Sequence, residues 1–136
     1  LNVLSRQLMS VTNGASPSQS QLNSLLEHYQ AGRYRAAEQL AVTMTLEFSG
    51  DPFGWKILGA VFAQTGRKSE AVNAFEKVVA LSPQDAEAYN NLGIALNEQG
   101  DFDKAIKYLK NAILNIRFLW IHSFSYSFSN LTFSTY

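Results

Sequence analysis

The sequence predicts an all-α protein made of helix pairs that repeat along the chain. Glycine recurs every 34 residues, at Gly32, Gly66 and Gly100. Alanine recurs with the same period, five residues after each glycine, at Ala37, Ala71 and Ala105. A fixed period of this length is typical of stacked units, each too small to bury its own hydrophobic face. We therefore expect three helix-turn-helix units, stacked as a short right-handed solenoid.

Each unit contains two stretches with the apolar spacing of a helix. In the second unit, Trp55, Leu58 and Phe62 share one helical face, and Phe75 and Val78 share another. The third unit repeats both faces with Tyr89, Leu92 and Leu96, then Ala105, Leu109 and Ala112. Glycine between the two stretches is expected to end the first helix in a left-handed conformation, and Asp101 to cap the next helix. The recurring alanine then lets the two helices approach closely.

The units are predicted at about 18–51, 52–85 and 86–116, within a repeat region of 16–116. Before them, in residues 1–15, Leu1, Leu4 and Leu8 predict a helix at about 1–12. Ser16-Pro17-Ser18-Gln19 is expected to be a capping box with proline at the first helical position. We hypothesise that residues 1–12 fold back onto the first repeat or onto a neighbouring chain.

The segment 117–136 leaves the repeat pattern and alternates serine with aromatic residues. The last repeat helix is expected to continue to about Trp120. Three interpretations stay open for this apolar end: an element that closes the core, a self-association surface, or unrelated sequence appended by an imperfect gene model. Packing on the last repeat is favoured, with some pairing between chains. The residues proposed for self-association are Trp120, Phe124, Tyr126 and Phe128.

Composition excludes several classes of partner and site. Eleven basic and eleven acidic residues cancel, so a nucleic-acid partner is not expected. The chain has no cysteine, which removes disulfides and thiolate metal sites. It shows neither a signal peptide nor an apolar run that would span a membrane, so we expect a cytoplasmic protein. Its start suggests a fragment or a trimmed chain.

The motifs resemble the tetratricopeptide repeat family. WKILGAVFAQTGRKSEAVNAFEKVVALSP at 55–83 is similar to that repeat in its tryptophan, its leucine-glycine pair, the later alanine and phenylalanine, and the closing proline. YNNLGIALNEQGDFDKAIKYLKNAI at 89–113 is similar, with Arg117 where the proline would stand. The resemblance covers about 18–116. It implies a non-enzymatic scaffold that binds a protein or peptide in a concave groove. In bacterial relatives such repeats also precede glycosyltransferase or sulfotransferase domains, which is the alternative function; a purely self-assembling module is another.

The resemblance also implies which residues line the groove. They are Phe53, Lys56, Ala60, Ala63, Gln64, Asn90, Asn91, Ile94, Asn97 and Glu98. An asparagine such as Asn91 both donates and accepts hydrogen bonds, so it suits a peptide backbone. Lys56 fits the lysine of a family site that holds a C-terminal carboxylate, but Ala60 and Glu87 replace the other residues of that site. In the first unit, Leu22, Leu26 and Tyr29 occupy the groove-facing slots.

No catalytic, metal or cofactor site is expected. His28 and His122 are isolated, and no carboxylates recur at a metal-ligand spacing. The glycines suit helix ends better than a phosphate-binding loop, which would need a preceding strand.

Overall fold

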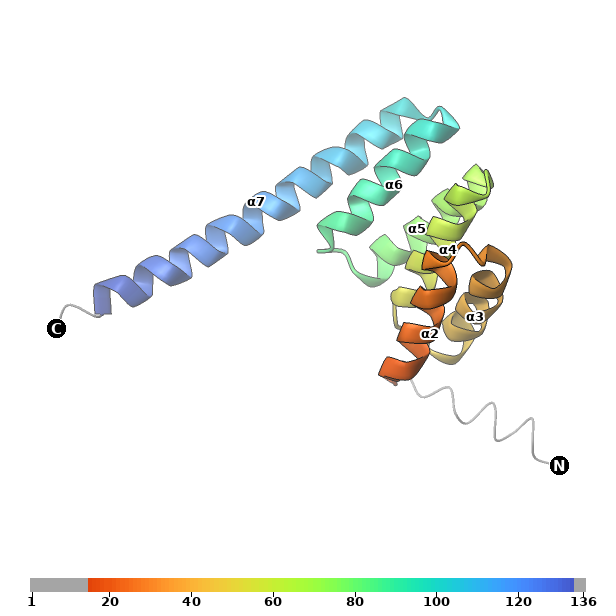
Figure 1. The fold of residues 1–136 in the computed structure, drawn as a ribbon. Helices are drawn as coiled ribbons and strands as arrows, with labels where there is room; N and C mark the ends of the chain where they lie inside the picture. Colours follow the sequence, from red (N-terminus) through yellow and green to blue (C-terminus); the bar gives the residue numbers. More distant parts are fainter. Residues whose placement is uncertain (1–14, 134–136) are drawn as a thin grey trace.

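The computed structural model describes residues 15–133, with side chains described as far as Phe124. Helices make up its regular structure (Figure 1). They are α2 (Gln19–Gln30), α3 (Tyr34–Glu47), α4 (Phe53–Gln64), α5 (Lys68–Leu81), α6 (Ala86–Gln99) and α7 (Phe102–Phe133). Successive helices pack on one another from α2 to α7, so that the chain forms a helical solenoid. The predicted fold class is confirmed.

The helix ends follow the expected capping chemistry. Gly32, Gly66 and Gly100 have φ angles of 71°, 77° and 93°, the left-handed conformation predicted for the end of each first helix. A Cβ atom at any of them would be strained. Asp101 then caps α7, because the Lys104 backbone N–H donates to its Oδ1 at 3.3 Å.

Two hydrophobic clusters lie where neighbouring units meet. One joins the first unit to the second around Leu25, Ala41 and Val61. The other joins the second unit to the third around Val78 and Leu92. The recurring alanines, Ala37, Ala71 and Ala105, are all buried. The scaffold therefore depends on contacts between consecutive units, as expected of a solenoid.

The start of α2 differs from the prediction by two residues. Its N-cap is Ser18, and the capping box pairs Ser18 with Gln21 instead of Ser16 with Gln19. The Gln21 N–H donates to Ser18 Oγ at 3.2 Å, and the Ser18 N–H donates to Gln21 Oε1 at 2.9 Å. Pro17 is buried just outside the helix. Both pairs match the same sequence pattern, so the pattern alone did not determine the register. The predicted helix at 1–12 lies outside the described residues.

The last helix is longer than predicted, since α7 continues past Trp120 to Phe133 as one element. Figure 1 shows its second half projecting away from the other helices. Phe118, Leu119, Trp120, Ile121 and Phe124 are all exposed, so the expected packing of these residues on the last repeat is wrong. Neither glycine nor proline interrupts residues 101–136, which is consistent with an unbroken helix. The side chains of Tyr126 and Phe128 lie outside the described ones.

Candidate functional site

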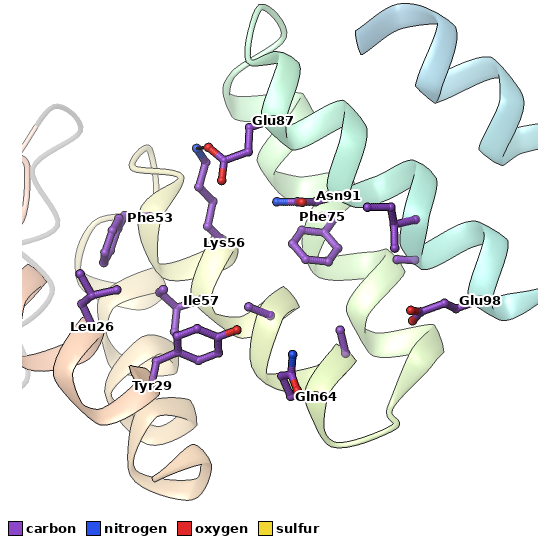
Figure 2. A pocket seen from close by; sticks show the side chains of 14 residues that line it. Leu26, Tyr29, Phe53, Lys56, Ile57, Gln64, Phe75, Glu87, Asn91 and Glu98 are labelled. Carbon is purple, nitrogen blue, oxygen red and sulfur yellow. Dashed lines mark ion pairs between the residues drawn. The ribbon is translucent and has the colours of Figure 1, made fainter. Parts of the chain in front are cut away.

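A groove of about 570 Å³ runs across the inner face of α2, α4 and α6. Helix α2 contributes Leu26 and Tyr29, α4 contributes one long face, and α6 contributes the opposite wall (Figure 2). Its lining residues are Leu26, Tyr29, Phe53, Lys56, Ile57, Ala60, Ala63, Gln64, Phe75, Glu87, Asn91, Ile94, Ala95 and Glu98. The volume is in the range of sites that enclose a small ligand or several peptide side chains.

The floor of the groove is apolar because glycine in α4 makes room for a ring from α5. A Cβ atom at Gly59 would lie 2.5 Å from Cε1 of Phe75, closer than side chains approach. The Phe75 ring therefore occupies the space that Gly59 leaves free and reaches the groove near Asn91 (Figure 2). Gly93 and Leu109 form the same arrangement one unit later, with a distance of 2.5 Å to Cγ of Leu109. The glycine thus accommodates a bulky side chain from the facing helix.

Lys56, the groove lysine, is already paired with acidic side chains. Its Nζ lies 2.6 Å from Oδ2 of Asp85 and 3.9 Å from Oε2 of Glu87. Asp85 is also the N-cap of α6 and accepts the Ala88 N–H at 3.1 Å. Partial burial raises the pKa of Asp85, but the hydrogen bonds from Lys56 and Ala88 outweigh it and hold the pKa below its ordinary value. Lys56 therefore carries two acidic partners of its own in the described structure.

The polar groups of the groove are arranged unevenly. Glu87 and Glu98 stand on α6, and with Asp85 they outnumber the single cation Lys56 (Figure 2). Asn91 points into the groove between them, and its side-chain amide has no hydrogen-bond partner among the described side chains. An unpaired amide can both donate to and accept from a bound backbone. The groove thus combines an apolar floor, the side-chain amides of Asn91 and Gln64, both unpaired within the described part of the chain, and an excess of negative charge.

Most of the expected groove residues lie together, and two do not. Phe53, Lys56, Ala60, Ala63 and Gln64 line the α4 side, whereas Asn91, Ile94 and Glu98 line the α6 side. Asn90 and Asn97 are exposed and outside the lining. A helix turns about 100° per residue, so these two positions are rotated away from the line through Asn91, Ile94 and Glu98.

Sequence reasoning missed the contribution of α5. Phe75 had been assigned to the helix-pair packing face, and nothing in its spacing shows that its ring passes α4 and reaches the groove. The available signal was Gly59, which leaves space on α4 opposite that ring. Ile57 and Ala95 also reach the lining from positions that belong largely to the core.

The described residues contain no cluster of three or more potential metal-ligating side chains. His28 Nδ1 accepts a hydrogen bond from Nε of Arg33 at 2.9 Å, so the imidazole is held by the turn between α2 and α3. None of the helices in the described part of the chain is long and apolar enough to cross a membrane.

The repeat period, the glycine-closed turns and the concave groove can now be compared with known proteins. The family model described as "Tetratricopeptide repeat" matches residues 58–115. This protein has the tetratricopeptide repeat fold. No curated protein sequence matches the chain.

Solved structures with this fold superimpose on most of the repeat region. A crystal structure of MamA has a TM-score of 0.64 and 24% identity, covering 66% of this chain and 53% of MamA. The translocator chaperone SycD of Yersinia enterocolitica type III secretion has a TM-score of 0.68 and 17% identity. The match covers 72% of this chain and 73% of SycD. The second tetratricopeptide domain of Spaghetti (RPAP3), bound to an HSP90 peptide, has a TM-score of 0.68 and 13% identity. The match covers 81% of this chain and 97% of that domain. These likenesses establish the fold, and the chain spans about half the length of MamA.

Proposed function

We propose that this protein is a non-enzymatic interaction scaffold whose groove binds an apolar segment of a partner protein that carries a basic residue. The observation that carries this proposal is the composition of the groove, with an apolar floor of Phe53, Ile57 and Phe75 beneath an acidic wall. A neighbour of the same fold was solved with a peptide bound, which supports a peptide as the kind of ligand.

Charge decides between two classes of peptide. A segment with acidic residues or a C-terminal carboxylate would meet Glu87, Glu98 and Asp85, and Lys56 could bind it only by giving up the 2.6 Å contact with Asp85. A segment with lysine or arginine gains attraction instead, strongest where the groove excludes water. Asn91 supplies hydrogen bonds to the peptide backbone without regard to its side chains.

Selection from a random peptide library against the immobilised protein tests the proposal. Selected peptides are expected to be rich in apolar and basic residues and poor in aspartate and glutamate. Their binding is expected to be lost in Ile94→Asp and strongly weakened in Glu98→Lys. Asn97→Lys introduces a lysine next to that position on the same helix but outside the groove, so it serves as the control and should bind normally. Acidic selected peptides, or equal binding by all variants, would refute the proposal.

A further inference from the structure

The outer face of α7 is a long apolar stripe that the rest of the described chain leaves uncovered. The 34-residue period identifies the equivalent face on α5, which α6 covers. Val72 on α5 is 6% exposed, whereas its equivalent Ile106 on α7 is 53% exposed. Val79 packs against the core, whereas its equivalent Ile113 is 65% exposed. The α7 positions that correspond to a buried junction in the preceding unit therefore face solvent.

The stripe continues past the repeat with the spacing of a coiled-coil seam. Its positions alternate steps of four and three residues, with one final step of four: Phe102, Ile106, Leu109, Ile113, Ile116, Trp120 and Phe124. Apolar residues with this alternation pack one helix against another by inserting into holes on the partner. We call these seven residues the α7 seam. All are exposed except Leu109, which is half-buried because its side chain packs against Gly93 of α6 at the border of the stripe. Trp120 stacks on Phe124 with ring centres 5.6 Å apart, so their rings form a continuous surface.

We propose that the α7 seam pairs with the α7 seam of a second copy of this chain in an antiparallel arrangement. A long helix is the partner that the seam spacing fits. The second half of α7 also needs a partner for stability. Residues 118–133 extend about 24 Å, and a lone helix of that length is marginally stable in water.

Within residues 15–133, the opposite end of the solenoid does not offer an apolar match for the seam. On α6, Ala88, Leu92 and Ala95 are buried in the cluster that joins the second and third units. Their equivalents on α2 are Ser20, Ser24 and Glu27, which are exposed and polar. Head-to-tail stacking of copies would place the seam against these three residues. A closed, two-fold pairing of α7 with itself buries the same apolar surface on both copies.

Charge favours the antiparallel direction. The four basic residues of α7, Lys104, Lys107, Lys110 and Arg117, lie in its first half, with Asp103 as the acidic one. Residues 118–133 contain no lysine, arginine, aspartate or glutamate. Parallel pairing sets each cation beside its own copy. Antiparallel pairing of the seam is centred near Ile113, so it sets Lys104 and Lys107 against the uncharged residues 119–122 and brings only Lys110 and Arg117 near each other. It also puts the two repeat bodies toward opposite ends of the helix pair, because the other helices lie beside the first half of α7 (Figure 1).

Sedimentation equilibrium on the full chain tests the pairing. The chain is expected to show twice the 15.1 kDa mass of one copy, in a concentration-dependent equilibrium that stops at the dimer. Ile113→Glu with Trp120→Glu should halve that mass, since both residues are exposed within one copy and need no refolding. Val42→Glu with Leu46→Glu changes two exposed apolar residues on α3 and should leave the dimer intact. A monomer at all concentrations, open-ended growth, or a dimer that survives the seam variant would overturn the proposal.

Single cysteines test the direction, because the chain has none of its own. Asp103→Cys, Lys110→Cys and Arg117→Cys are spaced by one heptad beside the seam. In an antiparallel pair centred near Ile113, the thiols of two Asp103→Cys chains lie about 30 Å apart and form no disulfide, whereas a mixture of Lys110→Cys and Arg117→Cys chains forms a mixed disulfide on mild oxidation. A disulfide between two Asp103→Cys chains would establish parallel pairing and contradict the proposal. These results do not depend on the groove, so this inference and the proposed function fail separately.

Discussion

The groove and the α7 seam both expose apolar side chains, yet they differ in how those side chains are held. The groove takes Tyr29, Phe53 and Phe75 from three helices of a packed stack, and its lysine is tied to Asp85. The seam lies on one helix whose second half has no helix beside it in the described structure (Figure 1). A concave, preorganised surface suits a short segment of another protein, whereas a convex stripe needs a second long helix.

The largest expected effect on stability is at the buried junction between the second and third units, compared with the exposed α7 seam. Leu92 is 0% exposed between the second and third units, so Leu92→Ala should cost about 2–5 kcal/mol of unfolding free energy. Ile113→Ala truncates a side chain on the seam and should cost less than about 0.5 kcal/mol when the chain is monomeric. Denaturant unfolding at low protein concentration measures both. Equal losses would show that the α7 face is covered within a single copy.

A smaller effect is expected at Gly59, where the lack of a side chain leaves room for the Phe75 ring. Gly59→Ala places a methyl group against the Phe75 ring and should cost about 1–3 kcal/mol through overpacking. It should also displace the ring and weaken peptide binding. Adding Phe75→Leu should recover part of the lost stability, because the two changes share one space. Strictly additive losses in this double-mutant cycle would refute the proposed contact.

The smallest effect concerns Asp85, which serves both the scaffold and the groove. Asp85→Ala removes the cap of α6 and the partner of Lys56, for a loss of about 1–2 kcal/mol. Asp85→Asn keeps a capping oxygen, so it should lose less than about 1 kcal/mol. Both changes leave the groove less acidic and should weaken the binding of basic peptides. Equal losses for the two variants would show that the cap contributes nothing.

The Asp85 contribution has a defined dependence on pH. Its folded-state pKa is lowered, so the stabilisation is fully present above the unfolded value of about 3.9 and is lost as pH falls through the folded value. The stability difference between the natural chain and Asp85→Asn should therefore be constant from neutral pH to about pH 5 and shrink below about pH 4. Unfolding curves across this range measure the difference. A difference that grows on acidification would contradict the lowered pKa.

The repeat period predicted the helix pairs because glycine and small residues are required at fixed places in each unit. Gly100 ends a helix in the left-handed conformation and Ala105 is buried between helices. Backbone geometry requires both, so their recurrence could be interpreted from sequence alone. Lys56, Asn91 and Ile94 were found on the groove for the same reason, since the scaffold determines which face each position occupies.

Three features were not predictable from the pattern. Phe75 reaches the groove only because Gly59 leaves space, which depends on two helices together. The pairing of Lys56 with Asp85 joins α4 to the N-cap of α6, two elements that are far apart in the sequence. Helix α7 runs on to Phe133 because no glycine or proline interrupts it. Without such a residue, the sequence offers no position at which to place the end of the helix.

Site-specific photo-crosslinking tests the central claim most directly. A photoreactive phenylalanine analogue is placed at Ile94, inside the groove, and in a second variant at Asn97, one turn away on the outside of the same helix. A bound apolar peptide with one arginine should crosslink to the first variant and not to the second, and a copy with glutamate for arginine should crosslink to neither. Crosslinks from both positions, or stronger crosslinking by the glutamate peptide, would contradict an acidic, peptide-binding groove.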